Sequence, residues 1–345
     1  MKKLVLNILN AEEPESKRVF LLLLMGFFMG FFVSGLSVGA ESLFLNNFNE
    51  ETDLPLAIVV SGAIGVVATY LFNYFQSKTS FVRLAGYTLL TIFVLLIGVE
   101  IAYSYLPDVS PLYFITFTFV LPFTYLILLI FWGAFGRLFD LRQSKRIIGG
   151  IDTGQLTASI LALLVIIPYL LNRPDFAEKD LITMSVISLG GMFLSFLWLM
   201  NSSKKYLIKA GRNKFVPYKK VLTDKYMLLM VGFVLVSVVA VTFIDYSFFS
   251  VASAQFNESN LATFLAYFNG TIIIFSFLFQ TFATDKIIAL YGLKVSLLIN
   301  PILILIMVGV ACLIGAGFGF TPDEPTFVYF FVIIAVSKLF VTSLK

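Results

Sequence analysis

Long apolar stretches separated by short polar connections dominate the sequence, among them residues 19–32, 84–99, 147–171 and 287–316. Apolar stretches of about 18 residues or more with few charges are typical of transmembrane helices, because a helix needs about 20 residues to cross the hydrocarbon core of a bilayer. The pattern predicts an all-α, polytopic membrane helical bundle. We expect ten spans, at residues 19–44, 55–75, 84–105, 111–136, 147–171, 181–201, 226–250, 261–283, 287–316 and 326–345.

The composition agrees with a membrane protein. Hydrophobic residues make up 59% of the 345 residues and charged residues only 13%, whereas soluble domains are roughly half apolar and a quarter charged. These values exclude a secreted domain, a cytosolic enzyme and a nucleic-acid-binding protein as first interpretations. The chain has no histidine and a single cysteine, Cys312, so neither a disulfide framework nor a thiolate metal site is expected. We therefore expect no cofactor, no metal site and no enzymatic activity.

Lysine and arginine gather in alternate connections between the predicted spans. The N-terminal segment, residues 1–18, is basic, the next connection contains acids alone, and only Arg173 and Lys179 depart from the alternation that follows. Cytoplasmic connections carry the excess of positive charge in membrane proteins. The pattern predicts a cytoplasmic N-terminus. We expect an integral, multi-pass protein of a bacterial inner membrane, with the lipid bilayer as its surroundings.

One connection, residues 202–225, is long and basic and follows six spans. It divides the chain into a six-span N-terminal half, residues 19–201, and four spans at residues 226–345. Two six-span halves joined by a long cytoplasmic loop are typical of major facilitator transporters. We expect that 6+6 layout here, with the last two spans absent from this chain. The basic connection is either a solvated linker at the anionic membrane surface or a site of regulatory lipid recognition.

Four acidic residues lie within or near the predicted spans: Glu41, Glu100, Asp152 and Asp245. An ionisable residue inside a membrane is costly, and each is therefore a candidate for function. Glu41 and Asp245 lie near the outer ends of the first and seventh spans, where parallel halves would place equivalent residues. If both face a central cleft, they are candidates for carboxylates that couple transport to a proton. The alternative is hydration at the outer rim, which applies equally to Glu100.

Asp152 lies in the glycine-rich segment 147–155, at the cytoplasmic start of the fifth span. Glycines allow helices to approach closely within a membrane. Asp152 either lines a cavity at such an approach or pairs with a nearby base, such as Arg146 or Arg83. Glycine pairs in the first and sixth spans are interpreted as helix-packing seams; these are Gly26/Gly30, Gly35/Gly39 and Gly190/Gly191.

Two cytoplasmic connections contain candidate gating residues. After the eighth span, Asp285 and Lys286 are followed by Gly292-Leu-Lys294, which resembles a stretched form of the loop signature of major facilitators. The resemblance implies that these charges cap helix ends and fasten the inward-closed state. The equivalent connection after the second span keeps the bases, Lys78 and Arg83, but lacks the acid.

The segment joining the fourth and fifth spans reads Phe131-Trp-Gly, then Ser144-Lys145-Arg146 and Gly154, and Ser337-Lys338 follows in the last span. These motifs resemble the ATP/ADP translocases, the nucleotide transport proteins of plastids and intracellular bacteria. The resemblance implies that Lys145, Arg146 and Lys338 contact an anionic substrate. The alternative is that these side chains extend to the cytoplasmic headgroups.

Two positions depart from that family. It carries a basic residue near the outer end of the first span, where this chain has Glu41, and a glutamate in the fourth span, where this chain has Val120-Leu121-Pro122. ATP carries about four negative charges, and phosphates are bound by Arg and Lys donors. The acids at membrane depth therefore argue against tight polyphosphate binding.

The sequence as a whole predicts a secondary transporter of a small organic anion, such as a nucleotide in ATP/ADP exchange, that works by alternating access with a proton or a counter-solute. The alternative is a transporter-derived membrane anchor or sensor, fused to a cytoplasmic regulatory domain beyond the chain end. The departures from the translocase pattern motivate this alternative.

Overall fold

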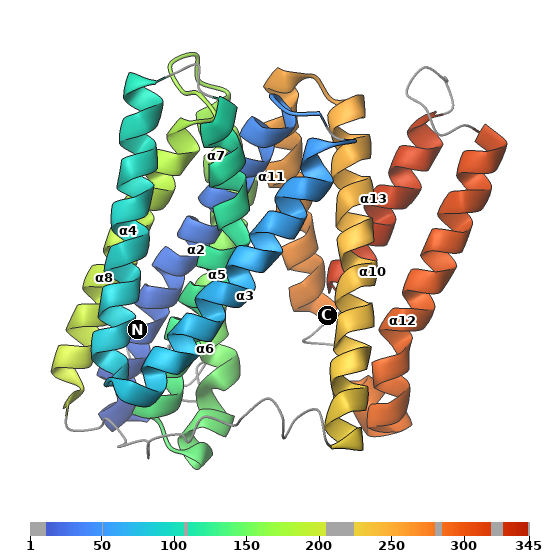
Figure 1. The fold of residues 1–345 in the computed structure, drawn as a ribbon. Coiled ribbons are helices and arrows are strands. Elements are labelled where there is room, and N and C mark those ends of the chain that lie inside the picture. The colour runs from blue at the N-terminus through green and yellow to red at the C-terminus, as the bar shows by residue number, and fades with distance from the viewer. Residues whose placement is uncertain are drawn as a thin grey trace. The chain divides into compact units, whose positions relative to one another are not determined.

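A computed structural model describes residues 12–49, 51–106, 110–204, 224–279, 285–318 and 327–343. Every regular element within these ranges is helical (Figure 1). The described helices fall into two compact units: α2 to α8, apart from the start of α3, form the first, and α10 to α13 form the second. The prediction of an all-α protein is confirmed.

The helices of the first unit follow the predicted spans. After a short 3₁₀ turn at Glu13–Glu15 come α2 (Ser16–Leu45), α3 (Asp53–Lys78), α4 (Phe81–Tyr105), α5 (Ser110–Leu138), α6 (Leu141–Leu161), α7 (Ile167–Leu171) and α8 (Asp180–Ser202). A π-helical turn at Ala162–Ile166 joins α6 to α7. Pro168, the second residue of α7, cannot donate a backbone hydrogen bond, and a π turn is a common way to accommodate such an interruption.

The second unit contains α10 (Lys225–Gln255), α11 (Glu258–Phe279), α12 (Asp285–Phe318) and α13 (Phe327–Ser343). Here α13 packs against α10, α11 and α12. A small apolar core forms where Val341 of α13 meets Val241 and Ile244 of α10, with Leu303 and Ile304 of α12 against it. This packing fixes the face that α10 presents to α13.

Eight helical segments among the described residues are long and apolar enough to cross a membrane, so the protein is an integral, multi-pass membrane protein. They coincide with the first eight predicted spans. The last two predicted spans correspond to shorter apolar stretches, Pro301–Gly317 within α12 and Phe327–Ser343, which is α13. Eight of the ten predicted spans therefore meet the length and hydropathy expected of a crossing.

Helix α2 lies at the centre of the first unit and packs against α5, α6 and α8 (Figure 1). It is apolar around its whole circumference, and Leu22, Met25, Met29 and Phe32 are fully buried. A helix that is hydrophobic on all sides lies in a protein core or spans a membrane, and here the neighbouring helices bury most of the apolar part of α2.

Glycines allow α6 and α8 to approach α2 closely. A Cβ atom at Gly30 would lie 2.5 Å from the carbonyl oxygen of Gln155 on α6, and one at Gly154 would lie 2.8 Å from the carbonyl oxygen of Leu23. A Cβ at Gly191 of α8 would lie 2.5 Å from the ring of Phe28. Real Cβ atoms do not tolerate such distances, so only glycine permits these helix contacts. The predicted packing seams on α2, α6 and α8 are confirmed.

Candidate functional site

Two charged side chains meet inside the second unit. Lys338 of α13 places its Nζ 3.6 Å from Oδ1 of Asp245 on α10. The Lys338 side chain is only 9% exposed and the Asp245 side chain 38%. Lys338 lies eleven residues after the start of α13 and five before its last residue, Ser343, and Asp245 lies ten residues before the end of α10. Both charges therefore lie more than one helical turn from the ends of their helices.

Two aromatic rings complete the surroundings of the lysine. Its Nζ lies 4.2 Å from the ring centroid of Phe248 and 4.2 Å from that of Phe249. These residues follow Asp245 on α10 by three and four positions, a spacing that places all three on one helix face. Both rings are buried. The negative faces of aromatic rings attract a cation, so the lysine is held by one carboxylate and two π systems.

This arrangement leaves hydrogen-bonding capacity on the ammonium group. A lysine ammonium has three donors, and 3.6 Å is longer than a direct hydrogen bond. None of the side chains or carbonyl groups in the described ranges accepts a hydrogen bond from Lys338. A buried cation with unused donors can bind an anionic oxygen, and Asp245 neutralises it when no anion is present. Chemically, the site is suited to reversible exchange of one anionic partner for another.

Sequence reasoning selected Lys338 and Asp245 but assigned them to different roles. Asp245 is predicted as a coupling carboxylate, equivalent in position to Glu41, and Lys338 as a substrate contact or a side chain that extends to the headgroups. In the structure Asp245 and Lys338 form an ion pair. Glu41 lies half-buried on α2 in the first unit, and its role in coupling stays a prediction. Phe248 and Phe249 were missed as site residues, although their spacing from Asp245 carried the signal.

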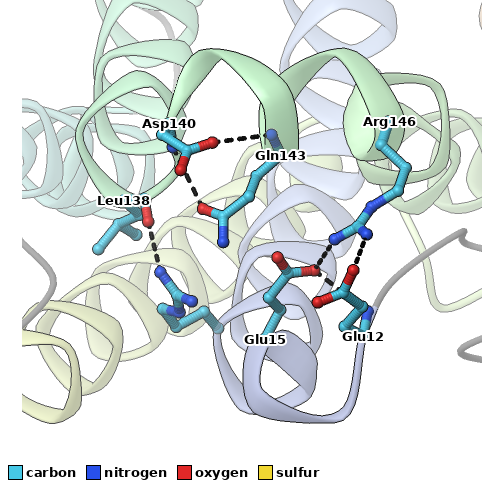
Figure 2. A network of polar contacts seen from close by, with 7 residues as sticks. Glu12, Glu15, Leu138, Asp140, Gln143 and Arg146 are labelled. Atoms are coloured by element: carbon cyan, nitrogen blue, oxygen red, sulfur yellow. Dashed lines mark hydrogen bonds and ion pairs between the residues drawn. The ribbon is translucent and has the colours of Figure 1, made fainter.

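Arg146 belongs to a different cluster, at the start of α2 and α6 (Figure 2). Its guanidinium donates to Glu12 and, at 2.6 Å, to Oε2 of Glu15, whose side chain is almost fully buried. Because two carboxylates already hold Arg146, its predicted contact with an anionic substrate would require displacing them. The side chain of Lys145 lies outside those that the structure describes.

Arg18 makes two further contacts, which hold the start of α2 against the connection between α5 and α6. Arg18 of α2 donates a hydrogen bond of 2.5 Å to the carbonyl oxygen of Leu138, and its guanidinium lies 4.9 Å from the ring centroid of Phe139. Asp140 caps α6 by accepting a 2.9 Å hydrogen bond from the backbone N–H of Gln143 (Figure 2). The cluster joins the start of α2 to the connection between α5 and α6, and we interpret it as structural.

Asp152 does not pair with either of its expected bases. Arg146 is held by Glu12 and Glu15, and Arg83 is exposed on α4. Within the described ranges, no side chain forms an ion pair or a hydrogen bond with the half-buried carboxylate of Asp152. The expected alternative of a local ion pair therefore has no support. Its possible role as a cavity-lining residue stays a prediction.

Glu100 connects two helices of the first unit. The hydroxyl of Thr183 on α8 donates a hydrogen bond to Oε1 of Glu100 on α4. The other carboxylate oxygen is buried and has no hydrogen-bond partner among the residues that the structure describes. Glu100 is thus in contact with α8 rather than simply exposed at the rim.

The candidate gating residues are only partly described. Lys78 lies at the end of α3 with its Nζ 4.1 Å from the ring centroid of Tyr74, and Arg83 is exposed near the start of α4. Asp285, Lys286 and Lys294 belong to α12, but their side chains lie outside those that the structure describes. Their role in gating stays a prediction.

Comparisons with known proteins do not assign a family. No protein-family model matches the chain, and no curated protein matches it. The resemblance to the ATP/ADP translocases therefore rests on the quoted motifs alone and stays a hypothesis.

Proposed function

We propose that the protein is a secondary transporter that carries a small organic anion across the membrane by alternating access. The observation that supports this function most directly is the buried Lys338, held by Asp245 and two phenylalanine rings on facing helices of a multi-pass membrane protein. A charge buried within membrane-spanning helices is expensive and marks a pathway for a solute more often than a structural contact.

The pair suggests how an anion could be taken up and released. In the empty carrier, Asp245 neutralises Lys338, so that the carrier can change conformation without moving an uncompensated cation through a low-dielectric region. An incoming carboxylate or phosphate displaces Asp245 and receives charge-assisted hydrogen bonds from the ammonium. After release, Asp245 returns to Lys338. Lys338 thus has an anionic partner in both the loaded and the empty carrier, and proton uptake by the displaced Asp245 carboxylate would keep the loaded site neutral.

The charge of the site favours anions of low valence. A single buried lysine carries one positive charge, whereas a triphosphate carries about four negative charges and is usually bound by several Arg and Lys donors. We propose a small carboxylate or a singly phosphorylated compound as the substrate class. ATP/ADP exchange, which the quoted motifs imply, is the nucleotide alternative, and the charge of this site argues against it. The major facilitator layout, and coupling to a proton or a counter-solute through Glu41, Asp152 or Glu100, belong to the same proposal.

Counterflow in proteoliposomes tests this function. Vesicles that contain the full chain are loaded with one unlabelled anion, and the transient accumulation of the same labelled anion is measured for carboxylates, phosphate esters, ADP and ATP. We expect saturable accumulation for at least one low-valence anion and none with vesicles that lack the protein. If the folded, reconstituted protein exchanges none of these anions, transport is contradicted and the membrane anchor or sensor becomes the better account.

A further inference from the structure

A separate cavity of about 540 Å³ lies between α3 and α5 of the first unit. Thr69, Phe72 and Gln76 of α3 line one side. Tyr125, Leu128 and Trp132 of α5 line the other with the same spacing, three and then four residues apart. That spacing places each trio on a single helix face, so two faces point into one space. Cavities that bind small molecules have volumes of about 300–1,000 Å³.

Aromatic rings form much of the cavity wall. Phe72 is buried on α3, whereas Tyr125 and Trp132 contribute their rings from α5. The indole of Trp132 is held edge to face between two neighbours: its ring lies 5.3 Å from that of Phe131 at 81° and 5.6 Å from that of Phe135 at 89°. These contacts fix the indole plane before any ligand arrives. A fixed aromatic plane favours a ligand that is itself flat.

The polar groups of the cavity are uncharged and unused. Four of the lining residues carry polar groups, namely the hydroxyls of Thr69 and Tyr125, the amide of Gln76 and the indole N–H of Trp132, whereas most of the exposed wall is apolar. None of these groups forms a hydrogen bond with another residue in the described part of the chain. Thr69, Tyr125 and Trp132 lie within apolar spans, where hydrocarbon supplies no hydrogen-bond partner, and Gln76 lies in the last turn of α3. A lipid acyl chain would form no hydrogen bond with any of the four groups, whereas a ligand with its own donors and acceptors would.

We infer that this cavity binds an uncharged, planar aromatic molecule that carries a hydrogen-bonding group. The rings of Phe72, Tyr125 and Trp132 contact its faces, and the amide of Gln76, which both donates and accepts, binds its polar edge. The lining residues themselves carry no formal charge and so offer a ligand no direct ion pair. The cavity contains neither Lys338 nor Asp245, so the test of this inference does not depend on the test of the anion site.

Binding of a matched pair of amides tests the inference. The full chain carries Trp198→Phe, which leaves Trp132 as its only tryptophan. Equilibrium dialysis against purified protein in micelles compares 2-naphthamide with its saturated counterpart, decahydro-2-naphthamide, after correction for protein-free micelles. We expect one saturable site that binds the aromatic amide at least about ten-fold more tightly, and saturable quenching of Trp132 emission by that amide alone.

Two substitutions separate the cavity from non-specific partition. Gln76→Leu is expected to weaken binding about ten-fold, and Thr69→Val by about three-fold, because each removes hydrogen bonds to the ligand. Asn73→Leu, on the same helix but exposed and outside the cavity lining, is the matched control and should leave the affinity unchanged. All variants are first checked for unchanged thermal unfolding.

Three results would overturn the inference. Equal affinity for the aromatic and the saturated amide would show that flatness is not recognised. Unchanged affinity in both Gln76→Leu and Thr69→Val would place the ligand elsewhere. Quenching of Trp132 by brominated lipid that the aromatic amide does not relieve would identify the occupant as an acyl chain.

Discussion

Lys338→Met is expected to lower anion counterflow by about 100-fold or more. The substitution keeps the length of the side chain but removes the buried cation that Asp245 and the rings of Phe248 and Phe249 surround. In the proposed loaded state the anion accepts hydrogen bonds from the ammonium, and truncating one partner of such a charge pair typically costs about 2–5 kcal/mol, where 1.4 kcal/mol corresponds to a factor of ten. The measurement is the initial rate of counterflow at equal amounts of reconstituted protein.

Three variants control for an effect on folding. Lys225→Met changes an exposed lysine at the start of α10 in the same way and should transport normally. Lys338→Met combined with Asp245→Asn removes both charges, so any stability lost through an unpaired carboxylate should return while transport stays absent. Lys338→Arg keeps the charge but has a different donor geometry, and partial activity is expected. Normal transport by Lys338→Met would exclude this lysine from the anion site.

Gly30→Ala is expected to destabilise the first unit by about 2 kcal/mol, because overpacking a well-packed contact typically costs about 1–3 kcal/mol. The added Cβ would lie 2.5 Å from the carbonyl oxygen of Gln155 and 2.9 Å from the Cβ of Ala158. A backbone carbonyl within a helix cannot move aside as a flexible side chain can. The seam between α2 and α6 must therefore open. Thermal unfolding of the purified protein in one detergent measures the change.

Gly86→Ala is the matched control for that substitution. A Cβ at Gly86 of α4 would meet nothing within 4 Å. In this open position the change should be neutral, or stabilising by up to about 1 kcal/mol, because alanine favours the helix more than glycine does. If the two variants unfold at the same temperature, the close approach at Gly30 does not contribute to stability.

Most of the helical architecture can be predicted from the sequence, because hydropathy is a local property and each apolar stretch identifies its own span. The glycine seams were also predictable, since close helix packing in a membrane requires small residues. The central place of α2 was less evident. Its lack of a polar face did not identify it, because α10 also lacks a polar face and is mostly exposed.

The pairing of charges could not be predicted in the same way. Asp245 and Lys338 are 93 residues apart, and only the packing of α10 against α13 brings them together. A pairing of Asp152 with Arg146, one of the two alternatives for this acid, is absent for a local reason. Residues six apart on a helix point in different directions, whereas partners on one face are three or four apart. Arg146 instead meets Glu12 and Glu15 from the N-terminal segment.

Anion binding to the Asp245→Asn variant tests most directly whether Lys338 exchanges its carboxylate partner for the substrate. The dissociation constant is measured by titration calorimetry for the anion with the strongest counterflow. If Asp245 competes with the anion for Lys338, its removal should tighten binding, by about ten-fold if the competition is worth 1.4 kcal/mol. An unchanged or weaker affinity in a variant that remains folded would contradict the exchange and leave Asp245–Lys338 as a structural ion pair.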